Sequence, residues 1–73
     1  LNTVIEESQL LERELRENKQ YGSSSREIWQ IQRIDWQINS AKSDNERLEL
    51  WQNRKRLLEK LKAQLNQNPN NYI

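Results

Sequence analysis

The stretch that decides the fold is residues 25–41, SREIWQIQRIDWQINSA. At about 100° per residue of an α-helix, its large side chains fall on two sides. One side collects Ile28, Ile31, Ile34, Ile38 and Ala41, and the nearly opposite side collects Trp29, Arg33, Trp36 and Ser40. A surface helix needs one apolar stripe toward the core and polar residues opposite. The second stripe therefore predicts a covering element: another helix of this chain, a second copy or a partner protein.

Length and composition narrow the class of protein. The 73 residues allow one small domain, and the start at Leu1 predicts a segment excised from a larger protein. The sequence has no His and no Cys, which removes disulfides, most zinc sites and the usual general base. It also lacks a glycine-rich phosphate loop. We therefore expect no enzyme activity and no cofactor.

The hydropathy pattern bears on membranes and on location. No apolar run is longer than two residues, as in Val4-Ile5 and Leu57-Leu58, which predicts neither a membrane span nor a signal peptide. The lack of cysteine is compatible with a reducing compartment. We therefore expect an intracellular, cytoplasmic location.

Three capping-box patterns divide the chain into helices: Thr3 to Glu6, Ser24 to Glu27 and Ser43 to Glu46. They predict helices over about 4–20, 25–42 and 44–67 in a single domain, 1–67, followed by a mobile Asn-rich tail over 68–73. Gly22 suits the left-handed position after the first helix. The short connection at Gly22 predicts that the first two helices lie antiparallel.

The boundary between the second and third helices has two interpretations. A strict four–three alternation from Trp29 to Leu61 favours one continuous helix from Ser25 to Leu65, with a coiled-coil seam. The poor helix formers over 39–45 favour a break near Ser43. The phase of the apolar residues favours the same break, because a continuous helix would bury opposite faces in its two halves. The fold class is all-α in both cases: an antiparallel helical hairpin or a three-helix bundle with coiled-coil packing.

Charge and core size both favour association. Residues 1–25 carry three cations against five carboxylates, a net charge of −2, and residues 44–73 carry six against four, a net charge of +2. This asymmetry favours antiparallel packing of the first and last helices, or head-to-tail association, and is too mild to indicate nucleic acid. Domains below about 70–80 residues rarely gain more than about 3–5 kcal/mol from one core. We therefore expect self-association, with a dimer as the simplest form, or binding to a partner protein.

The candidate binding residues are aromatic and basic. Trp29, Arg33 and Trp36 have the spacing i, i+4, i+7, and Trp and Arg dominate interface hot spots. The two indoles are either buried in the fold or a homodimer, part of an interface with another protein, or solvated beside Arg33. Trp51 is predicted to belong to the core, and Arg54 to a solvated basic run that alternatively contacts phosphate or an acidic partner. The predicted partner-binding set is Trp29, Gln32, Arg33, Trp36, Trp51 and Arg54.

Residues 25–34, SREIWQIQRI, resemble the second helix of antiparallel coiled-coil effector domains that bind small G proteins. The likeness is to the Ral-binding hairpin and, more loosely, to the homology region 1 fold. The Leu-x-Arg-x-Leu pattern of Leu11–Leu15 fits the same hairpin. This resemblance implies a small GTPase effector in which Trp29, Gln32, Arg33 and Trp36 face the G protein. The chain departs from the pattern by a shorter loop between the helices and by the whole segment after Ser43.

A second resemblance gives the alternative function. Residues 11–15, Tyr21 and residues 50–55 are similar to the first helix and the start of the recognition helix of homeodomains. That likeness implies DNA binding, with Asn53 on adenine and Arg54 on phosphate. The chain departs by a longer span from Arg26 to Trp51, by a start without a minor-groove arginine, and by leucines where basic residues belong (Leu57, Leu58, Leu61 and Leu65).

Overall fold

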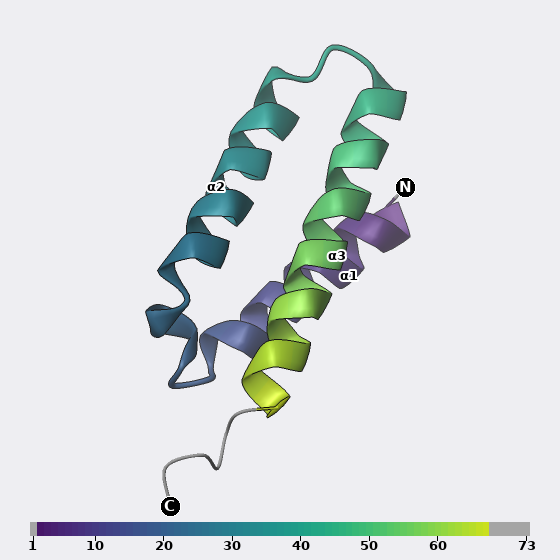
Figure 1. The fold of residues 1–73 in the computed structure, drawn as a ribbon. Coiled ribbons are helices and arrows are strands. Elements are labelled where there is room, and N and C mark those ends of the chain that lie inside the picture. Colours follow the sequence, from purple (N-terminus) through teal and green to yellow (C-terminus); the bar gives the residue numbers. More distant parts are fainter. Residues whose placement is uncertain (1, 68–73) are drawn as a thin grey trace, which may run out of the picture.

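The computed structural model describes residues 2–67 as helices joined by short turns (Figure 1). The elements are α1 (Asn2–Arg16), a single 3-10 turn η1 (Tyr21–Ser23), α2 (Ser25–Ser40) and α3 (Asp44–Gln67). No strand occurs within these residues, which confirms the predicted all-α class as a three-helix arrangement. Residue 1 and the predicted Asn-rich tail over 68–73 lie outside the described residues. None of the helices within residues 2–67 is both long enough and apolar enough to cross a membrane.

Helix α1 ends at Arg16, four residues before the predicted end, because Asn18 redirects the backbone. The Asn18 Oδ1 accepts a hydrogen bond from the backbone N–H of Gln20 at 2.8 Å. An Asn side chain that bonds two residues ahead stabilises a turn in competition with the helix. The prediction that Gly22 adopts a left-handed conformation is wrong, since no glycine has a positive φ and Gly22 lies within η1.

The break near Ser43 is confirmed. Helix α2 ends at Ser40, Ala41 is extended (φ −66°, ψ 141°), and α3 starts at Asp44. The Ser43 Oγ accepts from the Glu46 N–H at 3.2 Å, and Glu46 Oε1 accepts in return from the Lys42 N–H at 3.0 Å. This is a capping box with its return bond moved by one residue. It explains why the sequence does not continue as one helix from Ser25 to Leu65.

The other two predicted capping boxes are wrong. Helix α1 has already begun at Asn2, so Thr3 lies inside it rather than at its cap. Ser24 stands at the cap of α2 but its side chain makes no capping hydrogen bond. Only its backbone carbonyl is used, accepting from the Ile28 N–H at 2.9 Å.

Helix α3 is the central element, and α1 and α2 both pack against it (Figure 1). Lys55 pairs with Glu7 at 3.1 Å and Lys62 pairs with Glu14 at 3.3 Å. These two pairs are seven residues apart on both helices, so α1 and α3 run in the same direction. The predicted attraction between an acidic first helix and a basic last helix is confirmed, but their predicted antiparallel packing is wrong. The chain reverses twice, so α2 runs against both of the other helices.

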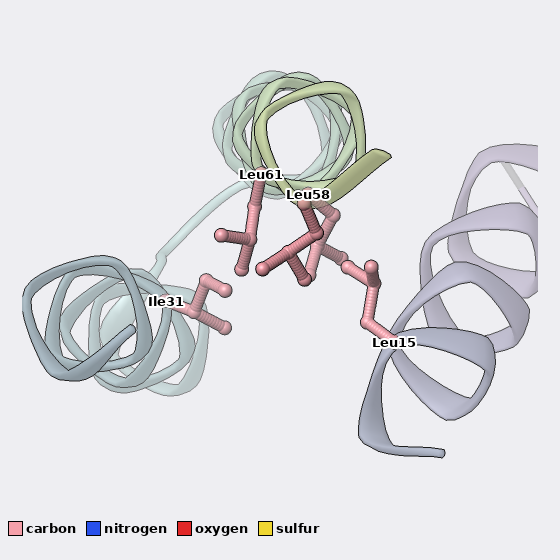
Figure 2. Packing of buried hydrophobic residues seen from close by; sticks show 5 residues of the cluster. Leu15, Ile31, Leu58 and Leu61 are labelled. Atoms are coloured by element: carbon pink, nitrogen blue, oxygen red, sulfur yellow. The ribbon is translucent and has the colours of Figure 1, made fainter. Parts of the chain in front are cut away.

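The apolar core lies in the half of the bundle nearest η1. Figure 2 shows Leu58 and Leu61 pointing from α3 between the other helices, Ile31 pointing in from α2 and Leu15 from α1. Leu65 completes the buried cluster, and Leu11, Tyr21 and Leu57 pack around it. The buried positions on α3, 58, 61 and 65, follow the 3.6-residue period of one helix face.

A buried arginine lies next to this core and joins all three helices. Arg54 of α3 is only 4% exposed. Its Nε donates to Asp35 Oδ1 of α2 at 2.6 Å, its Nη1 donates to Ser8 Oγ of α1 at 2.8 Å, and its Nη2 donates to Glu12 of α1. Its guanidinium carbon also lies 5.4 Å from the centre of the Trp51 ring. The fork of the guanidinium thus satisfies three acceptors on two neighbouring helices.

The electrostatics of this cluster keep its members ionised. Burial raises the pKa of Glu12, but the hydrogen bond and charge of Arg54, and then those of Arg16, outweigh it and leave the pKa below its ordinary value. Burial likewise lowers the pKa of Arg54, and the hydrogen bonds to Asp35 and Glu12 more than reverse this. A buried charge that is fully hydrogen-bonded avoids most of the penalty of leaving water.

Arg54→Ala is expected to be the costliest polar substitution in the domain. Removing one partner of a buried ion pair costs about 3–5 kcal/mol, and we expect the lower end here because the Asp35 side chain is 43% exposed and can hydrate. Arg54→Lys keeps the charge without the planar fork and is expected to lose about half as much. Urea denaturation measures both free energies of unfolding.

Arg47→Ala is the matched control, because Arg47 pairs with Asp44 on the surface at 2.7 Å. Exposed pairs of this kind contribute about 0–1 kcal/mol. Similar losses for Arg54→Ala and Arg47→Ala would contradict the central role of Arg54.

The lowered pKa of Glu12 predicts a loss of stability in acid. Its pKa in the unfolded chain is about 4.3. Since the folded pKa is lower, the stabilisation is fully present above the unfolded pKa and is lost as pH falls through the folded value. The free energy of unfolding of the wild type should fall more steeply below about pH 5 than that of Glu12→Gln. Parallel pH profiles for the two proteins would show that Glu12 is not the linked group.

Candidate functional site

Helix α2 uses its two stripes as the sequence predicts. Ile31 is buried, and Ile28, Ile34, Ile38 and Ala41 are half-buried. This stripe faces α3 and the core, which accounts for the first apolar side of residues 25–41. The second side is not covered by α3 or by any other described part of the chain.

We call this uncovered side the α2 outer face and define it by Arg26, Trp29, Gln32, Arg33 and Trp36, all of which are exposed. Trp29 is 61% exposed and Trp36 is 72% exposed. Burial of the indoles within the fold, one of the possibilities open from the sequence, is therefore excluded for the single chain. The indoles are solvated in the single chain or covered by another molecule.

The side chains of the α2 outer face form an open groove. Trp29, Gln32, Arg33 and Trp36 line a hollow of about 430 Å³. The two indoles are seven residues apart, two helical turns or roughly 10 Å, so they form the two ends of the groove. Four of the six predicted partner-binding residues thus come together in one place.

The groove is basic as well as aromatic. The guanidinium carbon of Arg33 lies 5.9 Å from the centre of the Trp29 ring, a cation–π distance. Within residues 2–67, neither Arg26 nor Arg33 forms an ion pair with a carboxylate. The two acidic residues of α2, Glu27 and Asp35, lie on its other side, where Asp35 holds Arg54. The groove therefore offers apolar area and positive charge together.

The structure removes both Arg54 and Trp51 from the candidate surface on α2. The prediction that Arg54 belongs to a solvated basic run is wrong, because it is buried and its donors are used by Ser8, Glu12 and Asp35. Trp51 is half-buried beside Arg54 rather than fully in the core. Neither residue lines the groove on α2.

Three residues that matter in the structure were not singled out from the sequence. Ser8 and Asp35 are two of the three acceptors for Arg54. The sequence carries a signal for both, because each is a polar residue with apolar residues four positions before it and three positions after it on its helix. Leu10 is 55% exposed, the one large aliphatic side chain in the described residues with this exposure. Helix geometry places Leu10 beside the stripe of Leu11 and Leu15, but it does not show that α3 leaves Leu10 uncovered.

The chemistry that this arrangement supports is binding. Within residues 2–67, no group of three His, Cys, Asp or Glu residues is placed to hold a metal ion. The groove contains indoles, an amide and a guanidinium, which are groups that recognise apolar and anionic surfaces.

Comparisons with protein-family models, curated proteins and solved structures give no match for this chain. The assignment of a function therefore depends on the geometry of the chain alone.

Exposure predicts how the tryptophans respond to mutation. Trp36→Ala should change the free energy of unfolding by no more than about 0.5 kcal/mol, because surface substitutions away from special features fall in that range. Ile31→Ala, on the opposite side of the same helix, should cost about 2–5 kcal/mol because Ile31 is 2% exposed in the core. Thermal or urea denaturation followed by circular dichroism measures both. Equal losses would mean that the indole is packed in the fold.

Proposed function

We propose that this chain is a non-enzymatic helical module for protein–protein interaction, acting as an oligomerisation or scaffold segment, and that the α2 outer face is its docking surface. The observation that carries the proposal is the pair of exposed indoles, Trp29 and Trp36, on either side of Arg33. Large exposed apolar patches rimmed by polar residues are typical of interaction sites.

The rest of the fold supports this proposal because both indoles lie outside the packed core. The core is completed by Ile31 on the other side of α2, and Arg54 fixes α2 to α3 through Asp35. A Trp that contributes little to the core and is left in water costs solubility, which favours a role in binding. The guanidinium of Arg33 adds a charge-assisted donor for a partner carboxylate.

A narrower version of the proposal names the small G proteins as partner. It is supported by the resemblance of residues 25–34 to effector hairpins and by the exposure of Trp29, Gln32, Arg33 and Trp36, the residues that the resemblance assigns to the G-protein side. The third helix packs on the other side of α2 and leaves these residues accessible.

DNA binding receives no comparable support. The homeodomain likeness assigns a phosphate contact to Arg54, but Arg54 is buried and hydrogen-bonded to two carboxylates. The exposed cations of α2 are accompanied by two indoles rather than by the row of basic residues that phosphate binding requires.

Photo-crosslinking in the cells that produce the chain tests the docking surface. A photoreactive amino acid replaces Gln32 at the centre of the groove, and in a second variant it replaces Asn53, which is exposed on α3. We expect one dominant covalent product from position 32, absent from position 53 and lost when Trp29→Ala and Trp36→Ala are added. Mass spectrometry of that product identifies a small G protein, another protein or a second copy of the chain.

Equal products from positions 32 and 53, or a product that survives the loss of both indoles, would overturn the assignment of the α2 outer face. A product formed by a small G protein only in its GTP-bound state would establish the narrower version.

A further inference from the structure

The described residues contain three strongly exposed large hydrophobic side chains, and these lie on two helices. Trp29 and Trp36 belong to the α2 outer face, and Leu10 lies on α1, on the side turned away from the buried Ser8 and Leu15. We call this second surface the α1 outer face and define it by Glu6, Leu10, Glu14 and Glu17. At 100° per residue, Glu6, Leu10 and Glu14 lie within about 80° of one another around the helix, and Glu17 is the first residue after the end of α1 at Arg16.

The two outer faces carry opposite charge. Glu6 and Glu17 form no ion pair within residues 2–67, and the same is true of Arg26 and Arg33. Around Leu10 there are three carboxylates, of which Glu14 is already paired with Lys62 of α3, and one exposed cation without an ion pair within residues 2–67, Arg13. The charged groups around the indoles are the guanidinium groups of Arg26 and Arg33. Complementary charge around an apolar centre is the pattern that selects one surface for another.

The spacing of these groups also agrees. The groove between Trp29 and Trp36 is centred near position 32, and Arg26 lies about 10 Å from that centre along the helix at a rise of 1.5 Å per residue. On the α1 outer face, Glu17 directly follows the last residue of α1, and six helical steps and one turn step from Leu10 again give about 10 Å. If Leu10 enters the groove with the two helices antiparallel, Glu17 lies opposite Arg26. Glu6 and Glu14, one turn on either side of Leu10, then lie within reach of Arg33.

A symmetric pairing of two α2 outer faces is disfavoured by the same charges. The centre of the groove would lie on the two-fold axis, so Arg33 of one copy would meet Arg33 of the other. Like charges in contact across an interface cost several kcal/mol. The α1 outer face has one cation beside it, Arg13, against the three carboxylates Glu6, Glu14 and Glu17, so it meets the basic α2 outer face with a net attraction.

We propose that the occupant of the α2 outer face is the α1 outer face of a second copy of this chain, with Leu10 in the groove between Trp29 and Trp36 and the two helices antiparallel. This inference rests on the α2 outer face being a docking surface, as argued above. The contact joins two different surfaces, so each copy has one of each kind to offer. Such an interface either closes into a ring or grows as an open chain, and does not stop at a symmetric dimer.

Sedimentation of two complementary variants tests the proposal. Leu10→Lys blocks the α1 outer face, and its new charge, four residues from Glu6 and Glu14, supports the helix. Trp29→Gln combined with Trp36→Gln blocks the α2 outer face with a good helix former. Between about 10 μM and 1 mM, where small interfaces assemble, the wild type should exceed the mass of a dimer. Each variant alone should remain a monomer, and their equimolar mixture should form a 1:1 heterodimer.

Controls separate folding and charge from assembly. Circular dichroism should show the same helix content for both variants as for the wild type. Asn53→Lys adds the same charge as Leu10→Lys at an exposed position of α3 and should leave the wild-type mass distribution unchanged. Arg26→Glu and Glu17→Arg should each weaken assembly, and the two together should restore it.

Several outcomes would overturn the proposal. A wild type that stays monomeric to 1 mM excludes a second copy as occupant, while a crosslink from position 32 to another protein would still support the docking surface. A dimer that persists in Leu10→Lys shows the symmetric pairing instead. A mixture that stays monomeric, or a charge exchange that fails to restore assembly, contradicts the proposed contact itself.

Discussion

The structure depends on one buried guanidinium. Arg54 hydrogen-bonds to both of the helices flanking α3, through Ser8 and Glu12 on one side and Asp35 on the other. An apolar core this small does not choose its alignment strongly, because leucines on α3 repeat every three or four residues and pack nearly as well after a shift by one turn. A guanidinium with three fixed acceptors is satisfied in one alignment only. We infer that Arg54 specifies the register of the bundle more than it adds to net stability, the role best attested for buried polar groups.

The sequence predicts the parts of this fold that follow from local chemistry. The break at Ser43 depends on hydrogen bonds between residues 42 and 46, and the inward stripe of α2 depends on the period of Ile28, Ile31, Ile34 and Ile38. Both are visible in a short window of sequence. The early end of α1 also depends on a local contact, but the sequence offers two possible helix ends there, Asn18 and Gly22. The helix ends before Asn18, whose side chain accepts a hydrogen bond from the Gln20 N–H.

The parts that could not be predicted involve residues far apart in the chain. Position 54 lies on the same face of α3 as Leu58, Leu61 and Leu65, so the helical period indicates an inward position for Arg54. Its acceptors are 19, 42 and 46 residues away, and no local pattern identifies them. The parallel direction of α1 and α3 likewise follows from the double reversal of the chain, not from their opposite charges, which are satisfied in either direction. The candidate site shows the same division. Trp29, Gln32, Arg33 and Trp36 share a face by helix geometry alone, whereas the exposure of Leu10 depends on where α3 lies.

The buried cluster and the exposed groove are connected through α2. Asp35 holds the inner side of this helix to Arg54, and its neighbour Trp36 stands on the outer side. Because Arg54 also holds α1 through Ser8 and Glu12, the α1 outer face and the α2 outer face have one fixed orientation relative to each other. A binding surface on a rigid element loses less conformational entropy on association than one on a mobile segment. In the proposed assembly it would also give each contact between copies the same rotation, which is the condition for a defined geometry rather than a disordered aggregate. The polar cluster inside the bundle thus acts on the outside as well, since it sets the angle at which two unlike helical faces are presented.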